Sequence, residues 1–316
     1  MTAIPLREES LKEFKNKVVV ISGSARGIGA ATVSLLHNYG AKVIHGDWDA
    51  SGGQAVDSSL SSPSPAGGGT TFVQTDVANY DSVLNLFDVA WKKYGRVDVA
   101  ISNAGVQEVW NWFEPSLDIE SVKTKPPTKV LDVNLLGTLY FARVASVYLS
   151  QNAAPSQDKS LILVSSTAGF KETPGLFTYT ASKHGVLGLL RSLRPYLIKT
   201  HNIRVNAICP WMTDTVMVQG VRDGWLKEGL PVNKPEDVAR VMLEVAVGTV
   251  PTGEKGMRVE GDRYNGRAVF VEGGRGWDIE VGIDETEEIW LGMEVSRTLN
   301  RGQEVLGDGT HWVKST

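Results

Sequence analysis

Two hydrophobic periods alternate along the chain. Short apolar runs rich in β-branched residues are separated by longer stretches in which apolar residues recur with the 3.6-residue period of a helix. Because strands that alternate with helices form right-handed crossovers, this pattern predicts a doubly wound α/β domain with a seven-stranded parallel sheet. The expected strands are 17–22, 41–46, 70–75, 97–102, 160–165, 203–209 and 267–271, and the expected helices are 27–39, 79–94, 129–150, 176–200 and 235–247.

Two stretches interrupt the alternation. Residues 58–69 (SSLSSPSPAGGG) are rich in Ser, Pro and Gly, which predicts a flexible surface loop. Residues 277–316 carry nine acidic and three basic side chains, and a helix is expected at about 285–299. We expect its apolar residues Ile289, Trp290 and Met293 to pack on the body or on a neighbouring subunit. The predicted organisation is one domain, 1–276, followed by an acidic C-terminal extension, 277–316, that is not an independent domain.

The composition argues against several classes of partner and site. The chain has 32 basic and 36 acidic residues, a net charge of −4 that argues against a nucleic-acid partner. The single cysteine, Cys209, excludes an internal disulfide, and the five histidines lack metal-ligand spacing, so no metal is expected. The N-terminus lacks a signal-peptide pattern, and no window approaches the ~18 apolar residues of a membrane span. We therefore expect a cytoplasmic protein with no membrane partner.

A glycine-rich turn follows the first strand and opens the first long helix. Such a turn lets the backbone approach a phosphate, and the free N–H groups of the helix start bind it. The spacing GxxxGxG in this strand–turn–helix context predicts a Rossmann-type dinucleotide site. Its residues are Gly23, Ser24, Arg26, Gly27, Ile28 and Gly29.

Asp47 at the end of the second strand addresses the choice of cofactor. A carboxylate there can accept both ribose hydroxyls of an adenosine and repels a 2′-phosphate, which favours NAD over NADP. Asp49 is a rival for this role, but we expect it to begin the next helix. Arg26 is compatible with a 2′-phosphate and so favours NADP, but this preference is weaker than that of Asp47 for NAD. Placing a carboxylate beside a phosphate costs more free energy than a solvated arginine gains from the phosphate.

Polar and small residues also end the third and fourth strands. Ligands of doubly wound sheets bind at the carboxyl ends of the strands, so these positions are expected to line the cofactor crevice. They are Asp76, Val77, Asn103, Ala104 and Gly105.

Tyr179 and Lys183 form the strongest candidate for catalysis. Positions four apart share a helix face, so the Lys183 ammonium can lower the pKa of the Tyr179 phenol, about 10 when free, and make it a usable general base. Ser166, just past the fifth strand, is positioned to join them.

Taken together, the segments SGSARGIG, DWD, DV, SNAG, DVNLLG, SSTAG, YTASKHG and NAICP resemble the short-chain dehydrogenase/reductase family. The resemblance covers roughly residues 14–275. It is strongest to the NAD-dependent 15-hydroxyprostaglandin dehydrogenase-like group, which includes fungal secondary-metabolite dehydrogenases. It implies a catalytic tetrad of Asn134, Ser166, Tyr179 and Lys183. Of these, Tyr179 and Lys183 are also expected to contact the cofactor, Lys183 at the nicotinamide ribose, and Asn134 is expected to hold a water.

The resemblance also implies cofactor contacts at Trp48, Pro210, Thr213 and Thr215 and assembly into a homodimer or homotetramer through helices 129–150 and 176–200. The chain departs from the family pattern at Trp211, where the family has glycine. This tryptophan either lines the substrate pocket or points into the core.

Large apolar side chains fall in the segments that surround the substrate in this family. They predict a hydrophobic, polycyclic or aromatic secondary alcohol as substrate. The alternatives are an NADPH-dependent ketoreductase of a secondary-metabolite pathway and a non-catalytic dinucleotide-binding interaction protein. The expected substrate residues are Trp110, Trp112, Trp211, Met212, Met217 and Trp225.

Overall fold

One central sheet organises the molecule. The computed structural model describes residues 2–60, 64, 66–151, 157–250, 263–307 and 309. Within them nine strands form one sheet in the order β1-β9-β8-β7-β6-β5-β2-β3-β4. Seven of these strands run parallel and confirm the predicted doubly wound arrangement: β2 (Val18–Ser22), β3 (Lys42–Asp47), β4 (Gly69–Gln74), β5 (Val99–Ser102), β6 (Lys159–Val164), β7 (Ile203–Pro210) and β8 (Ala268–Glu272).

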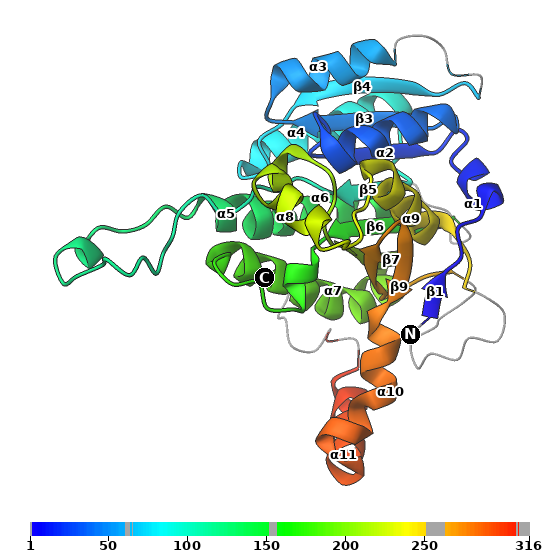
Figure 1. Cartoon of the computed structure of the whole chain (residues 1–316). Coiled ribbons are helices and arrows are strands. Elements are labelled where there is room, and N and C mark those ends of the chain that lie inside the picture. The colour runs from blue at the N-terminus through cyan, green and yellow to red at the C-terminus, as the bar shows by residue number, and fades with distance from the viewer. Residues whose placement is uncertain are drawn as a thin grey trace.

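Helices cover both faces of the sheet because its central strands are apolar on both sides. One face packs against α1, α2 and α9, and the other packs against α4, α6 and α7 (Figure 1). The carboxyl ends of the parallel strands therefore meet at one edge, between the two helical layers. The bounds of these helices are α1 (Glu8–Lys12), α2 (Gly27–Asn38), α4 (Tyr80–Tyr94), α6 (Gly137–Ser150), α7 (Phe177–His201) and α9 (Pro235–Val247).

The prediction of a purely parallel, seven-stranded sheet is wrong at one edge. There β9 (Arg275–Asp278) pairs antiparallel with β8, and β1 (Thr2–Ile4) pairs antiparallel with β9. The turn into β9 uses Gly273 and Gly274, both with positive φ, so the chain reverses within two residues. Strands of three and four residues are too short to show an alternating pattern. The predicted domain boundary at 276/277 falls inside β9.

The helix predicted at 129–150 is interrupted. It consists of α5 (Lys129–Leu131), a π-helical turn (Asp132–Leu136) and α6, and the π turn carries Asn134. Among the described residues, this stretch alone is long and apolar enough to cross a membrane, which corrects the expectation that no window comes close. Inside the protein, 44% of the 18-residue apolar window is buried, so the apolar character of this stretch also fits a helix that packs on the sheet.

Further helices lie outside the expected helix ranges, and the first of them begins after Asp49, as expected. α3 (Ala50–Ser59) contains Gly52 and Gly53, which weaken a helical pattern; a Cβ on Gly53 would lie 1.9 Å from the Phe72 ring, so glycine lets α3 approach β4. α8 (Gln219–Lys227) follows β7. The predicted loop 58–69 runs from the end of α3 to the start of β4, and its residues 61–63 and 65 lie outside the described part of the chain.

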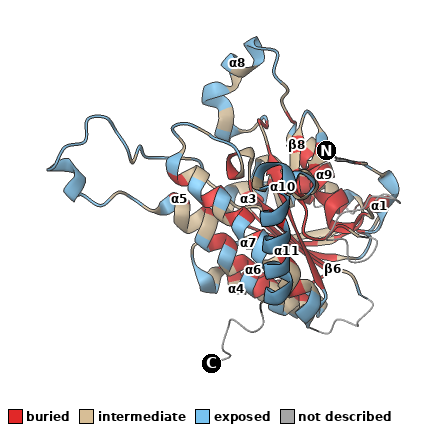
Figure 2. Cartoon of the chain, turned by 90° about the horizontal axis from the view of Figure 1, so that it is seen from below, coloured by how far each residue is buried: buried red, intermediate tan, exposed pale blue. Residues whose placement is uncertain are grey.

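The C-terminal extension forms two helices instead of one. α10 (Ile279–Leu291) and α11 (Met293–Leu306) meet at Gly292 and project from the body (Figure 1). Ile289, Trp290 and Met293 are all exposed, so they do not pack on the body, and their packing on a neighbouring subunit stays a prediction. Figure 2 shows α10 and α11 as largely exposed. Residues 308 and 310–316 lie outside the described part of the tail.

Candidate functional site

The first turns of α7 carry Tyr179 and Lys183. The Lys183 side chain is only 4% exposed, and its Nζ donates to the Val164 carbonyl at the end of β6 at 3.0 Å. That Nζ lies 5.7 Å from the centroid of the Tyr179 ring. The i,i+4 spacing thus brings the ammonium beside the phenol, as the sequence predicts.

Burial shifts the pKa of both Tyr179 and Lys183. It lowers the pKa of Lys183 to about 8, which still leaves a cation at neutral pH. It also raises the pKa of Tyr179, while a hydrogen bond from Ser166 acts in the opposite direction. A half-buried phenol beside a buried ammonium can exchange its proton with a bound hydroxyl group.

Ser166 lies two residues after the end of β6 and hydrogen-bonds to the tyrosine. Its Oγ accepts from the Ala168 backbone N–H at 3.2 Å, where it caps a short 3-10 turn (Thr167–Gly169). This contact fixes the hydroxyl at the carboxyl edge of the sheet, within reach of the Tyr179 phenol.

Asn134 is fully buried in the π turn, and its carboxamide binds the loop after β5. Its Oδ1 accepts from the Val106 N–H at 2.8 Å, and its Nδ2 donates to the Val106 carbonyl at 2.9 Å and to Ser182 Oγ at 3.3 Å. A Cβ placed on Gly105 would lie 3.4 Å from Asn134 Oδ1 and 3.5 Å from Lys183 Nζ. The four predicted catalytic residues therefore gather around one point of the crevice.

The glycine turn fits a dinucleotide phosphate. Gly23 and Gly27 have φ values of +74° and +54°, which side chains rarely adopt. A Cβ on Gly29 would lie 1.8 Å from the Gly23 carbonyl oxygen, so only glycine lets α2 begin this close to the turn. The resulting cradle presents main-chain groups at the start of a helix of 12 residues.

The loop after β5 holds this turn in place. Asn103 Nδ2 donates to the Gly23 carbonyl at 2.7 Å. The Ser22 hydroxyl accepts from the N–H groups of Asn103 and Ala104, both at 3.3 Å. The Ser22 hydroxyl therefore connects the ends of two neighbouring strands.

Asp47 lies at the tip of β3 and faces the glycine turn. Its Oδ2 accepts from the Ala25 N–H and its Oδ1 from the Asp49 N–H, each at 2.9 Å. Asp49 caps α3 through the Gly52 N–H, as expected, and forms an ion pair with Arg26. The arginine that would favour a 2′-phosphate is thus already engaged by a carboxylate.

The other predicted cofactor residues lie along the same edge. Trp48 is 71% exposed, and Lys129 Nζ lies 5.4 Å from its ring centroid. Thr215 reaches over the glycine turn, since its Cγ2 would be 3.1 Å from a Cβ on Gly27. The Ser24 hydroxyl instead binds His45 Nδ1 and the Gly46 carbonyl, so it stabilises the turn from inside. The remaining members, at strand ends or in the segments that follow them, are Ile28, Asp76, Val77, Pro210 and Thr213.

The predicted substrate residues form two separate groups. Trp211 packs edge-on against Trp225 at 4.9 Å between centroids and also contacts the Phe270 ring at 5.9 Å. Met212 beside it is buried, and Met217 is exposed. Trp110 and Trp112 lie on an arm, residues 107–128, that projects from the body, and the structure gives no ring contact between them and Trp211 (Figure 1).

One residue of the site escaped the sequence analysis. Glu108, at the base of the arm, accepts from the Tyr179 backbone N–H at 2.8 Å and from the Thr178 hydroxyl. It caps the N-terminus of α7, whose own Leu176 cap offers no side-chain acceptor. No local pattern reveals this contact because the two residues are 71 positions apart.

The family model described as short chain dehydrogenase matches residues 17–225, about two thirds of the chain. The chain belongs to the short-chain dehydrogenase family. By family it is an oxidoreductase that acts on alcohols or ketones with NAD(H) or NADP(H).

Two relatives match nearly the whole chain. The short-chain dehydrogenase/reductase prx4 of Penicillium rubens is 29% identical over 98% of this chain and 90% of the relative. The 5′-hydroxyaverantin dehydrogenase of Dothistroma septosporum is 30% identical over 93% of this chain and 95% of the relative. These fungal relatives support the secondary-metabolite part of the resemblance, and the likeness to the 15-hydroxyprostaglandin dehydrogenase-like group stays a prediction.

The solved structures agree on the fold. The 3-ketoacyl-(acyl-carrier-protein) reductase from Brucella melitensis, complexed with NADH, has a TM-score of 0.67 and 23% identity over 83% of this chain and 98% of its own. At this identity the likeness shows a shared Rossmann-type fold.

Proposed function

We propose that this short-chain dehydrogenase oxidises a hydrophobic, polycyclic or aromatic secondary alcohol to a ketone with NAD, with Tyr179 as the general base. The observation that carries this proposal is the placement of Tyr179, Ser166 and Lys183 at the same edge of the sheet as the glycine turn. Asp47 completes that edge. One crevice then receives both the cofactor and the reacting alcohol.

In the proposed reaction, Tyr179 removes the hydroxyl proton of the alcohol while Ser166 Oγ holds the same oxygen by a hydrogen bond. Lys183 stabilises the phenolate with its positive charge and hydrogen-bonds the nicotinamide ribose. Bound NAD supplies the acceptor for the hydride of the carbinol carbon. Asn134 Oδ1 binds the Val106 N–H with one lone pair and has a second for the water that connects Lys183 to solvent.

NAD is favoured over NADP by two observations. The Asp47 carboxylate lies beside the glycine turn, where it would accept ribose hydroxyls and repel a 2′-phosphate. Arg26 forms its ion pair with Asp49, so a phosphate would have to compete with a carboxylate that is already bound. An NADPH-dependent ketoreductase is the second candidate, because the Arg26 side chain is 62% exposed and lies beside the glycine turn.

The substrate class rests on the aromatic group beside the site. Trp211, Trp225 and Phe270 form consecutive ring contacts just past β7, and Phe170 extends the row by a contact of 5.8 Å with Phe270. Large flat rings bind flat apolar ligands through burial.

The proposal also includes assembly into a homodimer or homotetramer in the cytoplasm. The family resemblance implies that α6 and α7 pair between subunits, and α6 exposes the apolar side chains of Leu139 and Val147.

A panel of secondary alcohols, assayed for NADH formation with NAD or NADP, tests the proposal. Polycyclic and aromatic alcohols with NAD should give the highest kcat/KM, and small polar alcohols or sugars the lowest. Turnover with NADP alone would instead support the ketoreductase. Absence of turnover in both directions, despite NADH binding, would support the non-catalytic dinucleotide-binding protein.

A further inference from the structure

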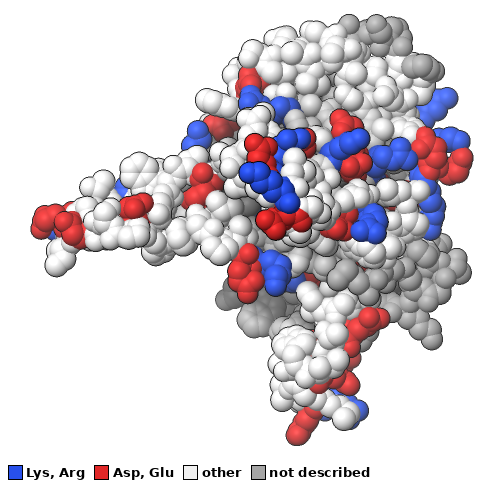
Figure 3. Space-filling view, in the orientation of Figure 1, with Lys and Arg blue, Asp and Glu red and all other residues white. Residues whose placement is uncertain are grey.

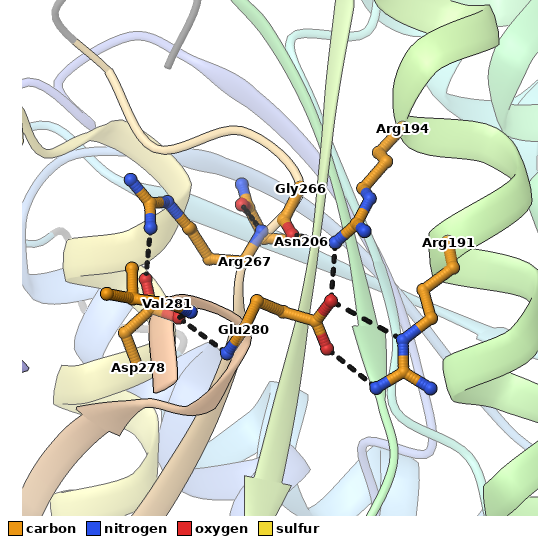
Figure 4. A network of polar contacts seen from close by, with 8 residues as sticks. All are labelled: Arg191, Arg194, Asn206, Gly266, Arg267, Asp278, Glu280 and Val281. Atoms are coloured by element: carbon orange, nitrogen blue, oxygen red, sulfur yellow. Dashed lines mark hydrogen bonds and ion pairs between the residues drawn. The ribbon is translucent and has the colours of Figure 1, made fainter. Parts of the chain in front are cut away.

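Two buried clusters of titratable groups lie outside the catalytic residues. One anchors the base of α10, where the Glu280 carboxylate binds Arg191 at 2.8 Å and Arg194 at 2.6 Å (Figure 4). Two permanent cations balance this carboxylate, so the cluster serves as a fixed anchor for the helix. The other cluster is centred on His45 of β3, which is fully buried and has the Asp57 carboxylate beside it. Because an imidazole gains or loses its proton near neutral pH, this second cluster can change its charge.

His45 and the next residue of β3 hold the start of the glycine turn. The Gly46 carbonyl oxygen accepts from the N–H groups of Gly23 at 2.7 Å and of Ser24 at 3.2 Å. The Ser24 Oγ lies 2.9 Å from His45 Nδ1 and 3.1 Å from the same carbonyl oxygen. The side chains of His45 and Ser24 are both fully buried, so they support the turn from the inside and do not touch a ligand themselves.

The surroundings of His45 determine how a charge on its ring is balanced. Within the sheet it pairs with Ile21 of β2 and Phe72 of β4, both uncharged, and the Phe72 ring centroid lies 5.5 Å from that of the imidazole. From α3, Asp57 Oδ1 lies 3.3 Å from His45 Nε2, and Asp47, two residues along β3, is the second carboxylate that acts on the ring. Burial lowers the pKa of His45 by more than these two carboxylates raise it, so the ring of the free protein is mostly neutral at pH 7.

The number of hydrogens at Ser24 shows what a second proton on His45 would change. The hydroxyl has one hydrogen, and the Gly46 carbonyl oxygen already receives two N–H groups. A neutral ring that donates its Nε2–H to Asp57 therefore accepts the Ser24 hydrogen at Nδ1. A charged ring carries a hydrogen on Nδ1 and donates it to Ser24 Oγ, so the hydroxyl turns its own hydrogen to the Gly46 carbonyl oxygen. Both arrangements fit the same distances, so the turn keeps its shape while a positive charge is added behind it.

A positive charge behind the glycine turn would attract the phosphates of a dinucleotide. Arg26, the one cation in the sequence of the turn, forms an ion pair with Asp49. On the face of the molecule shown in Figure 3, basic and acidic side chains are interspersed and form no extended basic patch. The phosphates therefore depend on main-chain N–H groups and on charges close to the turn. Because His45 is shielded from water, its charge would act strongly across the single serine between them.

We propose that His45 is a positioning residue whose protonation is coupled to cofactor binding: the phosphates bound at the glycine turn draw a proton onto the buried imidazole. This inference rests on the proposed function, which supplies NAD as the dinucleotide. The coupling is reciprocal, so cofactor affinity increases as the pH falls from the pKa of His45 in the complex to its pKa in the free protein. The second of these pKa values lies below the usual value of about 6.5.

Calorimetric titration of the full-length protein with NADH at pH 6, repeated in buffers of different ionisation enthalpy, counts the protons taken up on binding. The wild type should take up a fraction of a proton. His45→Asn keeps an amide oxygen that can accept from the Ser24 hydroxyl but has no titrating group, so it should take up none. Between pH 8 and pH 6 the NADH affinity of the wild type should increase by at least about fivefold relative to that of His45→Asn. No proton uptake by the wild type, or equal uptake by His45→Asn, overturns the proposal.

Two further variants test the path and keep the experiment decisive if His45→Asn fails to fold. Ser24→Ala removes the acceptor that the charged ring needs for its Nδ1–H, and Asp57→Asn removes the carboxylate that balances the ring, so each should reduce the proton uptake. His201→Asn, at the far end of α7 from the crevice, is the matched control and should keep the wild-type uptake. Wild-type uptake in both Ser24→Ala and Asp57→Asn would show that His45 is not the group that takes up the proton.

Failure of the proposed function gives a different result. If the wild type binds NADPH more tightly than NADH, the choice of NAD is wrong, and the same comparison of wild type with His45→Asn is made with NADPH. The two cofactors carry the same pyrophosphate, so the difference in proton uptake between the two proteins should persist. If the wild type binds neither cofactor, the proposed function and the coupling to His45 both fail.

Discussion

The two halves of the crevice are built differently. On the cofactor side, the glycine turn is tied to Asp47 and Asn103 by hydrogen bonds of 2.9 and 2.7 Å, which fix its shape. On the substrate side, the arm 107–128 and α8 consist largely of exposed residues. In the proposed function, the first half binds a constant molecule, the cofactor, with main-chain groups, and the second half binds a variable substrate with side chains on loops. Cofactor choice can therefore be argued from contacts, whereas substrate choice rests on the character of the aromatic rings.

The largest effect should come from the residue at the junction of the two halves. Tyr179→Phe removes the proton acceptor and keeps the ring, so turnover of the alcohol should fall by about 10²–10⁴-fold. NADH affinity, measured by fluorescence, should stay unchanged because the cofactor contacts remain. Retained turnover would show that the phenol is not the base.

Lys183→Met should have the next largest effect, and its sign can be worked out from pKa. Without the ammonium the pKa of Tyr179 rises, so less phenolate exists at neutral pH and oxidation slows by roughly tenfold to 100-fold. The loss should shrink as the pH rises through the alkaline range. A pH profile of kcat in both directions checks this, since reduction uses the protonated phenol and should suffer less. Parallel profiles for variant and wild type would contradict this role for Lys183.

Asp47→Asn changes the cofactor side of the site and leaves the substrate side intact. Loss of the carboxylate should weaken NADH binding by roughly tenfold and strengthen NADPH binding, because the repulsion of a 2′-phosphate disappears. Asp49→Asn is the matched control, since it releases Arg26 and leaves Asp47 in place. If the control changes cofactor preference more than Asp47→Asn does, Arg26 governs the choice.

Trp211→Gly restores the residue typical of the family and tests the substrate side alone. The KM for a polycyclic alcohol should rise by about tenfold, with kcat and NADH affinity nearly unchanged, because a buried aromatic contact is lost. Trp110→Gly on the exposed arm should cost less. A larger effect at Trp110 would show that the arm, and not the Trp211 group, forms the wall of the substrate pocket.

The sequence predicts well those features that local geometry determines. The glycine turn, Asp47 and the Tyr179–Lys183 pair follow strand ends or share one helix face, so position along the chain fixes position in space. The interruption at Asn134 and the cap at Glu108 were not predicted, because each depends on a partner distant in sequence. The antiparallel edge was not predicted because its strands are too short to show an alternating pattern. The second helix of the C-terminal extension was not predicted because polar side chains lie between the two helices, where apolar ones are usual.

The central claim of the proposed function is that Asp47 makes the cofactor half select NAD over NADP. Titration of the wild type with NADH and with NADPH, followed by the fluorescence of the nicotinamide, tests it most directly. We predict that NADH binds at least about tenfold more tightly, as expected from a carboxylate facing the 2′ position. Equal affinities, or tighter binding of NADPH, would contradict the assignment of Asp47 and with it the account of this site.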